Sequence, residues 1–309
     1  TMILTICPKP SIDGTVELDS LNVGQLNRVN SKPETYSGKA LNVAKGVARL
    51  GEECIATGFM FNEHAKVFEY ALTKERVKHD FVYCEGKART NYKIIDKKAM
   101  LTEINDRGEK VGREKQIELI ESVQNLSKQC DIAVMSGSLP LGVEHSFYRE
   151  VLSVIPENVK KIVDTGKDNL VEALKTGVYL VKPNIIELED YVNSILHSHK
   201  DVISACRTLI DHGAQNVLCS LGSEGAIFTD GSRSYYCKSA NVAINSTVGA
   251  GDSMVASAAV QIMKGADAEE ILRCAVAAGT AAITTSGTNL FYKDKYDEIY
   301  KKISVEEIK

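Results

Sequence analysis

The sequence predicts an α/β protein in which helices cover both faces of a mostly parallel sheet, with a small antiparallel β lid. Three observations support this prediction. Short apolar, β-branched runs alternate with amphipathic stretches of helical period along most of the 309 residues. Several of these runs end in Gly, Ser or Asn directly before a helical pattern, which is where open α/β sheets place their ligands. Two early segments break the alternation and show short strands with turn residues.

The alternating part of the chain defines the predicted sheet and its helices. Runs typical of buried strands occupy residues 2–7, 54–59, 131–137, 161–166, 179–184 and 216–222. Amphipathic stretches occupy residues 41–51, 115–129 and 202–213. Strands that alternate with helices form βαβ units, whose strands run parallel beneath the helices. No repeat or long linker interrupts this pattern, so we expect a single domain over residues 1–309.

The two exceptional segments are residues 13–36 and 80–104, which we expect to form the lid. Each carries alternating strand patterns and little helical periodicity. A four-stranded piece with one apolar face needs a cover. The lid is therefore expected either to close over a ligand site or to form a dimer surface.

Composition and charge limit the possible partners. The net charge of −4 gives no bulk attraction to nucleic acid or to an anionic membrane. There is no apolar run of membrane-spanning length, and the first residues do not resemble a signal peptide. The eight cysteines are widely spread, without metal-ligand spacing, so we expect reduced core residues in a cytoplasmic protein.

The stretch STVGAGDSM at 246–254 is the strongest candidate for an anion site. It leads into a helical pattern, and the first turn of a helix offers free N–H groups at the positive end of its dipole. Gly249, Ala250 and Gly251 would supply these donors. Met254 stands where a dinucleotide-binding GxGxxG turn needs its third glycine, and no GxxxxGK[ST] motif occurs, so both of those phosphate loops are excluded.

Asp252, which follows these donors, has two interpretations. As a carboxylate in a first helical turn it would stabilise the helix by about 0.3–1 kcal/mol. As a functional group it would accept the proton of an attacking hydroxyl, because phosphoryl transfer depends mainly on positioning and charge neutralisation. The helix dipole favours the ionised form, so we expect Asp252 to be a weak base.

Two motifs resemble the signatures of the ribokinase-like carbohydrate kinases. They are TVGAGDSM at 247–254 and YSGKALNVAKGVARLG at 36–51, about 210 positions apart and in the family's order. Shorter matches between them are RTNYKI (89–94), TEIN (102–105), SGSLPLG (136–142), KPNIIEL (182–188) and SLGSEGA (220–226). The set is most similar to the 1-phosphofructokinase branch, followed by the tagatose-6-phosphate kinases. The resemblance implies a three-layer α/β/α fold and a sugar-phosphate kinase that uses ATP and Mg²⁺.

The resemblance also implies roles for single residues. Asp252 would be the catalytic base, and the backbone of Gly249, Ala250 and Gly251 would hold the γ-phosphate. The substrate side would comprise Asp13, Gly38, Lys39, Asn42, Arg89 and Lys93, the last two near the sugar phosphate. Asn184 and Glu187 would organise Mg²⁺, usually through water. The nucleotide side would comprise Ser220, Gly222, Gly225, Ala277 and Gly279.

Each of these assignments has a structural alternative. A lysine at position 39 is also typical of a solvated loop, and positions 89, 91 and 93 of a solvated strand face. The spacing of positions 184 and 187 is that of a helix capping box. Small residues at 275–282 also permit close helix packing.

The sequence departs from the family pattern at the sugar end. SGKA replaces the usual Gly-Gly-Lys-Gly, so we expect a strained backbone at Ser37. CPKPSID replaces the usual Asn-Pro-Ala-hydrophobic-Asp, which puts Lys9 and Pro10 near Asp13. DTGKD replaces the usual Asp-Thr-Ser-Gly. These differences bear most directly on the identity of the sugar.

Two classes of function remain open. The first is an ATP-dependent hexose-phosphate kinase acting on fructose 1-phosphate or tagatose 6-phosphate, since Lys39, Arg89 and Lys93 offer more cations than a neutral sugar needs. TEIN favours fructose 1-phosphate. The second is a non-catalytic sugar-phosphate sensor, against which the intact GAGD argues; a Rossmann dehydrogenase is disfavoured by the missing glycine. The expected partners are a sugar phosphate and ATP, with a homodimer through the lid.

Overall fold

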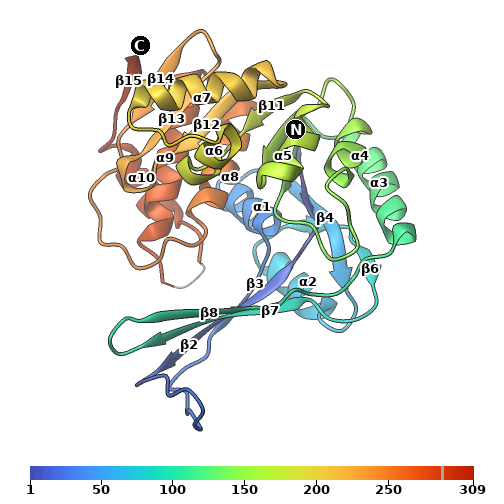
Figure 1. Cartoon of the computed structure of the whole chain (residues 1–309). Coiled ribbons are helices and arrows are strands. Elements are labelled where there is room, and N and C mark those ends of the chain that lie inside the picture. Colours follow the sequence, from blue (N-terminus) through green and yellow to red (C-terminus); the bar gives the residue numbers. More distant parts are fainter. Residues whose placement is uncertain (287–288) are drawn as a thin grey trace.

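The computed structural model describes residues 1–286 and 289–309, and it places a twisted sheet between two layers of helices (Figure 1). The sheet has the order β15-β14-β13-β12-β11-β10-β9-β1-β4-β5, and β6 pairs with β4. Its strands are β1 (Ile3–Cys7), β4 (Cys54–Phe61), β5 (Lys78–His79), β6 (Val82–Cys84), β9 (Ile132–Ser136), β10 (Lys160–Asp164), β11 (Val178–Val181), β12 (Ala214–Ser220), β13 (Ala226–Thr229), β14 (Ser234–Cys237) and β15 (Val305–Ile308). All pairs from β5 to β12 are parallel, whereas β13, β14 and β15 form an antiparallel edge.

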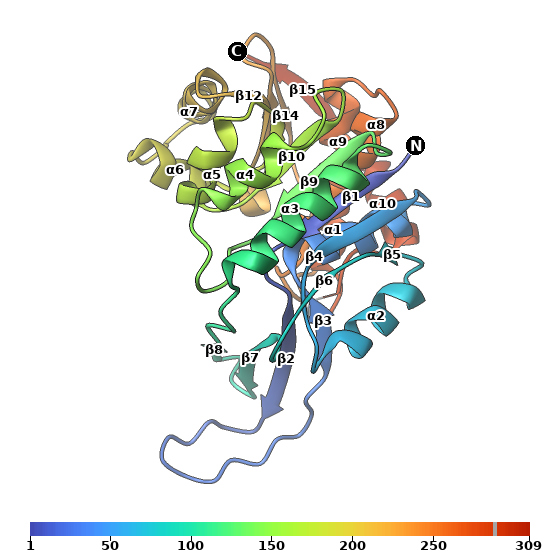
Figure 2. The same ribbon diagram turned by 90° about the vertical axis from the view of Figure 1, so that its right-hand side faces the viewer.

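The helices divide between the two faces of this sheet (Figure 2). One face is covered by α1 (Lys39–Arg49), α8 (Ala250–Met263) and α9 (Ala268–Ile283), with α10 (Lys293–Tyr300) packed on α9. The other is covered by α3 (Arg113–Ser127), α4 (Phe147–Ser153), α5 (Lys167–Leu174), α6 (Ile185–Val192) and α7 (His199–Asp211). A further helix, α2 (Ala65–Lys74), packs against β5 at the sheet edge. The predicted three-layer α/β/α architecture is confirmed.

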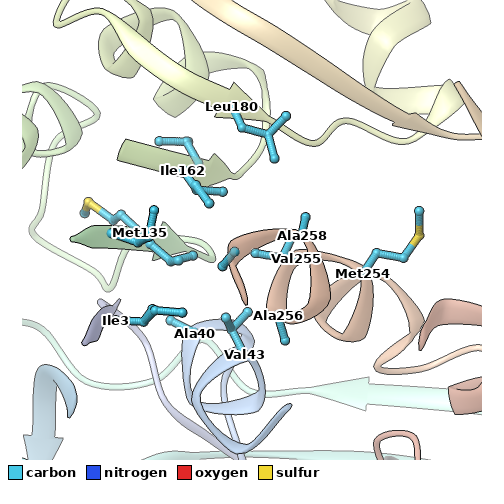
Figure 3. Close-up of a cluster of buried hydrophobic side chains, with 14 of the residues drawn as sticks. Ile3, Ala40, Val43, Met135, Ile162, Leu180, Met254, Val255, Ala256 and Ala258 are labelled. Atoms are coloured by element: carbon cyan, nitrogen blue, oxygen red, sulfur yellow. The ribbon is translucent and has the colours of Figure 1, made fainter. Parts of the chain in front are cut away.

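The close approach of α1 and α8 under the centre of the sheet sets the position of the site. Figure 3 shows their small side chains beneath strand residues, with labelled members Ile3, Ala40, Val43, Met135, Ile162, Leu180, Val255, Ala256 and Ala258. A Cβ atom on Gly46 would lie only 2.6 Å from the Cβ of Ala256. Glycine at position 46 therefore allows the two helices to pack this closely.

The lid is a separate four-stranded sheet in the order β3-β2-β7-β8, and it projects from the body of the molecule (Figure 1). Its strands are β2 (Ser11–Leu18), β3 (Glu34–Ser37), β7 (Arg89–Asp96) and β8 (Leu101–Asn105). The pairs β2–β3 and β7–β8 are antiparallel, and a parallel β2–β7 pair joins them. Because β6 pairs with β4 in the central sheet, the second half of the lid begins at Arg89 and not at the predicted residue 80.

The remaining sequence expectations concern the cysteines and the membrane. All eight cysteines are free and buried, as predicted. No helix in the described ranges 1–286 and 289–309 has the length and apolarity needed to cross a membrane.

Candidate active site

One cavity of about 680 Å³ lies where the carboxyl ends of β10, β11 and β12 face the root of the lid. Its volume is within the range of small-molecule sites, roughly 300–1,000 Å³. The predicted residues that line it are Asp13, Gly38, Lys39, Asn42, Arg89, Lys93, Asn184, Glu187, Ser220, Gly222, Gly225, Gly249, Ala250, Gly251, Asp252 and Gly279. Ala277 is the one predicted residue outside this lining. The fold thus gathers residues that are up to 266 positions apart, from Asp13 to Gly279, around one space.

The turn at 249–252 has the geometry of an anion site. Gly249 adopts φ 83° as the N-cap of α8, which only glycine does without strain. The amides of Ala250, Gly251 and Asp252 are in the first helical turn, where N–H groups have no intrahelical acceptor. These donors therefore face the cavity at the positive end of the helix dipole.

Asp252 is held in place by a side chain from α1. The Nδ2 of Asn42 donates a hydrogen bond of 2.8 Å to Oδ2 of Asp252, and the hydroxyl of Ser37 donates one of 3.1 Å to Oδ1 of Asn42. These three residues are buried and derive from β3, α1 and α8. The chain of hydrogen bonds fixes the carboxylate at the base of the cavity.

Burial raises the pKa of Asp252 to about 6, even though Lys39 and the hydrogen bond from Asn42 favour the charged form. The expectation that the helix dipole would keep Asp252 a weak base is therefore wrong. Desolvation of the carboxylate outweighs the positive end of the helix. A base with a pKa near 6 is well matched to proton transfer at neutral pH.

Two lysines share a buried carboxylate beside this turn. The Nζ of Lys39 lies 3.5 Å from Oδ2 of Asp164, and the Nζ of Lys182 lies 3.6 Å from Oδ1. Burial acts to raise the pKa of Asp164, but the two ammonium groups hold it below its usual value. In turn Asp164 raises the pKa of Lys39. A Cβ on Gly251 would lie 3.3 Å from the Nζ of Lys182, so this cation borders the anion turn.

Sequence reasoning missed Lys182 and Asp164 as site residues. Both motifs were visible, KPN and DTGKD, and each charged residue stands at or just after the carboxyl end of a buried strand. Lys182 is 4% exposed and Asp164 is 1% exposed. A side chain with a charge that is buried this deeply nearly always has a partner of opposite charge. The partner is identified only by the folded structure, so the sequence alone could not show that these two residues belong to the site.

The lid contributes the polar end of the cavity. Arg89, Asn91 and Lys93 lie on one face of β7 and all line the cavity, as their spacing predicts. Asn91 donates a hydrogen bond of 3.1 Å from Nδ2 to Oδ1 of Asp13 across the β2–β7 pair. Lys93 lies 3.9 Å from Glu103, its partner on β8. This end presents hydroxyl-binding carboxylate and amide groups next to cations.

The loop between β3 and α1 is shaped by Gly38. This residue has φ 143°, and a Cβ there would lie 2.7 Å from the Sγ of Cys7. The expected strain at Ser37 does not occur, because Ser37 ends strand β3 and is not among the described residues with positive φ. Of Ser37, Gly38 and Lys39, only Gly38 has a positive φ.

Asn184 and Glu187 form a complete capping box at the start of α6. The N–H of Glu187 donates to Oδ1 of Asn184 at 2.8 Å, and the N–H of Asn184 donates to Oε2 of Glu187 at 2.9 Å. Both side chains also line the cavity, so the structural and functional interpretations are compatible. Within residues 1–286 and 289–309, no three His, Cys, Asp or Glu side chains gather as a metal-binding group.

The opposite end of the cavity is more apolar. Its lining there includes Ile244, Val248, Val276 and Ile283. The α9 residues on this wall follow the helical spacing 276, 279, 280 and 283, and Ala277 lies off that stripe, fully buried in the core. Ala277 is thus outside the lining of this cavity, and its predicted place near the nucleotide stays a prediction. Gly279 packs against Met254 of α8, and both residues reach the cavity.

Comparison with known proteins identifies the family. The model of the pfkB family carbohydrate kinases matches residues 10–295. The chain belongs to the pfkB family of carbohydrate kinases. A tagatose-6-phosphate kinase of Staphylococcus epidermidis is 32% identical over 311 residues, covering 99% of this chain and 100% of the relative. A 1-phosphofructokinase of Borreliella burgdorferi is 32% identical over 309 residues, covering 99% of each.

The fold of this pfkB kinase agrees with that of a solved relative. The crystal structure of phosphofructokinase-2 from Escherichia coli in complex with potassium superposes with a TM-score of 0.89 at 30% identity, over 97% of this chain and 98% of that chain. The predicted resemblance, the ribokinase-like fold and the assignment as a sugar-phosphate kinase are thereby confirmed. As a kinase of this family, the enzyme binds a sugar phosphate and ATP.

Proposed function

We propose that this kinase transfers the γ-phosphoryl group of ATP to the free primary hydroxyl of fructose 1-phosphate, giving fructose 1,6-bisphosphate and ADP. The observation that carries the proposal is the polarity of the cavity at the root of the lid. Asp252 and the anion turn lie at its centre, the cations Arg89 and Lys93 at its lid end, and apolar side chains at its α9 end. A phosphorylated sugar matches the cationic lid end, and the base of a nucleotide matches the apolar α9 end. The 1-phosphofructokinase relative favours fructose 1-phosphate.

The residues of the chain suit an in-line transfer. A lone pair of the sugar hydroxyl attacks the γ-phosphorus, the bond to the β–γ bridging oxygen breaks, and the hydroxyl proton passes to Asp252. The amides of residues 250–252 neutralise charge on the transferring group, and Lys182 adds a cation beside Gly251. Asn42 orients Asp252 through its 2.8 Å hydrogen bond. Proximity and charge neutralisation are thus supplied by rigid elements.

Mg²⁺ is the metal that we propose for this site. Mg²⁺ in kinases keeps several waters and binds through one or two carboxylates together with substrate phosphates. Glu187 and Asn184 fit this requirement, because the capping box uses one carboxylate oxygen of Glu187 and leaves the second for a water or ion. When bound, the ion would neutralise charge on the β- and γ-phosphates.

The test is a coupled kinase assay in which fructose 1-phosphate, fructose 6-phosphate and tagatose 6-phosphate are compared side by side. The highest kcat/KM is expected for fructose 1-phosphate. A higher value for tagatose 6-phosphate would instead favour the activity of the Staphylococcus relative. No turnover of any of the three, with retained binding, would indicate the sensor function.

Replacement of the base provides the second test. Asp252→Asn is expected to lower kcat by roughly 10²- to 10⁴-fold, because general-base catalysis contributes about that much. Binding of ATP and of the sugar phosphate, measured by calorimetry, should stay within a few-fold of the original. An active Asp252→Asn variant would remove Asp252 from the catalytic step.

We also propose that the lid mediates a homodimer. Strand β8 is exposed along its whole length, with Leu101 and Ile104 each more than half exposed. An edge strand with apolar exposed side chains is favourable for pairing with a second chain.

A further inference from the structure

A second cation, Lys9, lies beside Arg89, which lines the lid end of the cavity, although Lys9 itself is not among the lining residues. Lys9 occupies the short connection between β1 and β2, in the CPKPSID segment. A Cβ on Gly108 would lie 3.4 Å from the Cβ of Arg89 and 3.6 Å from the Cε of Lys9. Both side chains therefore lie beside the same glycine, and the charge of Arg89 acts on the ammonium group of Lys9.

These two cations have no close counter-ion. Neither Lys9 nor Arg89 has an ion pair within 4.0 Å among the described residues. The Nε of Arg89 is buried and has no hydrogen-bond partner in the part of the chain that the structure describes. By contrast, Lys93 lies near Glu103, and Lys39 and Lys182 lie near Asp164. Lys9 and Arg89 thus differ from these other cations, each of which has a carboxylate nearby.

The electrostatics of Lys9 agree with this geometry. Burial is the main cause of a lowered pKa of Lys9, and repulsion from Arg89 lowers it further. Asp106 partly opposes these effects from a distance, but its Oδ1 already accepts the N–H of Gly108 at 3.0 Å. Two like charges held together in a half-buried position are unfavourable until an anion joins them.

We propose that Lys9 and Arg89 together bind the phosphate group that the sugar already carries, which makes Lys9 a specificity-determining residue of this chain. Arg89 lines the cavity directly, and the carbonyl oxygen of Lys9 lies 3.6 Å from where a Cβ of Gly38, another lining residue, would be. A guanidinium fork and a flexible ammonium group are complementary ligands for a phosphate dianion. This inference rests on the proposed sugar-phosphate kinase function and deepens it.

The residue type at position 9 decides how much positive charge this part of the chain offers to a phosphate group. Position 9 is a lysine in the segment CPKPSID, whose only other charged side chain is Asp13. Lys9 therefore adds one positive charge toward a substrate that carries about two negative charges.

The test replaces Lys9 by methionine, which keeps the length of the stem and removes the charge. Lys9→Met is expected to raise the KM for fructose 1-phosphate by roughly 10- to 100-fold, the usual effect of losing one charge-assisted hydrogen bond. The kcat and the KM for ATP should change less than about threefold, because catalysis and nucleotide binding occur elsewhere in the cavity. Lys9→Arg should retain most of the affinity. Lys200→Met, on an exposed turn of α7, is the matched control and should leave every constant unchanged.

A binding measurement separates this proposal from the proposed function. Calorimetry of fructose 1-phosphate and of unphosphorylated fructose, without nucleotide, should show that Lys9→Met weakens only the phosphorylated ligand. Binding that depends on Lys9 without turnover would reject the kinase function and retain the phosphate site. Unchanged KM and binding in Lys9→Met, or an equal loss for both sugars, would overturn the assignment of Lys9 while leaving the kinase function intact.

Discussion

Asp252 shows how one residue obtains its chemistry from opposing influences. Burial raises its pKa to about 6, whereas Lys39 and the hydrogen bond from Asn42 lower it. As the proposed proton acceptor, Asp252 must be ionised, so kcat/KM is expected to fall about tenfold per pH unit below pH 6. Asn42→Leu removes a donor to the charged form and should move this fall to higher pH. Initial rates from pH 5 to 9 measure the shift, and an unmoved acid limb would contradict the role of Asn42.

The same residue is expected to cost stability at neutral pH. The folded pKa of Asp252 lies above the ordinary carboxyl value of 3.8, so its stabilising contribution is complete below that value and lost as the pH rises through about 6. At pH 8 the Asp252→Asn variant should therefore have a free energy of unfolding up to about 3 kcal/mol higher than that of the original protein, as measured by urea unfolding. Near pH 4 this difference should vanish. A constant difference across this range would show that the charge is not its origin.

The expected role of Lys182 follows from the two groups that its ammonium group lies beside. Its ammonium group borders Gly251 and shares Asp164 with Lys39. Lys182→Met is expected to lower kcat by about 10²- to 10³-fold, as for the loss of one donor to transition-state charge. It should also lower the free energy of unfolding, because Asp164 then keeps a single cationic partner. An effect on the KM for the sugar phosphate alone would place Lys182 at the other end of the cavity.

At the scale of elements, the contact between α1 and α8 couples the fold to the site. These helices carry Asn42 and Asp252, and they approach each other at Gly46 and Ala256. Gly46→Ala should destabilise the protein by about 1–3 kcal/mol, because a new methyl group at 2.6 Å must separate the helices. It should also lower kcat, since the Asn42–Asp252 hydrogen bond is stretched.

The matched control for this contact is the double variant Gly46→Ala with Ala256→Gly, which moves the methyl group from one helix to the other. It should recover much of the kcat, although glycine within α8 itself costs about 1 kcal/mol. Urea unfolding and steady-state rates measure both effects. Recovery of neither would show that the two helices are not coupled at this contact.

At the scale of the whole molecule, the exposed strand β8 of the lid is where the proposed homodimer is tested. Leu101→Glu combined with Ile104→Glu places charges on the exposed strand β8 and is expected to convert a dimer into a monomer in sedimentation. Ile195→Glu, an equally exposed apolar position between α6 and α7, is the control and should leave the mass unchanged. A monomeric unmodified protein would exclude the dimer and leave the lid as a cover for the cavity.

The layered fold follows from local sequence, whereas most of the cavity lining was predicted through the resemblance to the carbohydrate kinases. Alternating strand and helix patterns are imposed by burial on two faces of a parallel sheet, so they appear in the sequence itself. The turn at 249–252 is similarly local, because its amides are free for any helix that begins there. The residues that sequence reasoning missed, Lys182 and Asp164, are those whose role depends on what lies opposite them.

The sequence by itself determined the α/β class, the resemblance to the family, and the glycine-rich turn with the carboxylate next to it. Only the tertiary structure decided that burial raises the pKa of Asp252 to about 6, that two lysines share Asp164, and that Lys9 stands beside Arg89. The physical reason is the range of the interactions. Backbone conformation and hydrophobic period act between near neighbours in the chain, whereas desolvation and charge pairing depend on distances that exist only after folding.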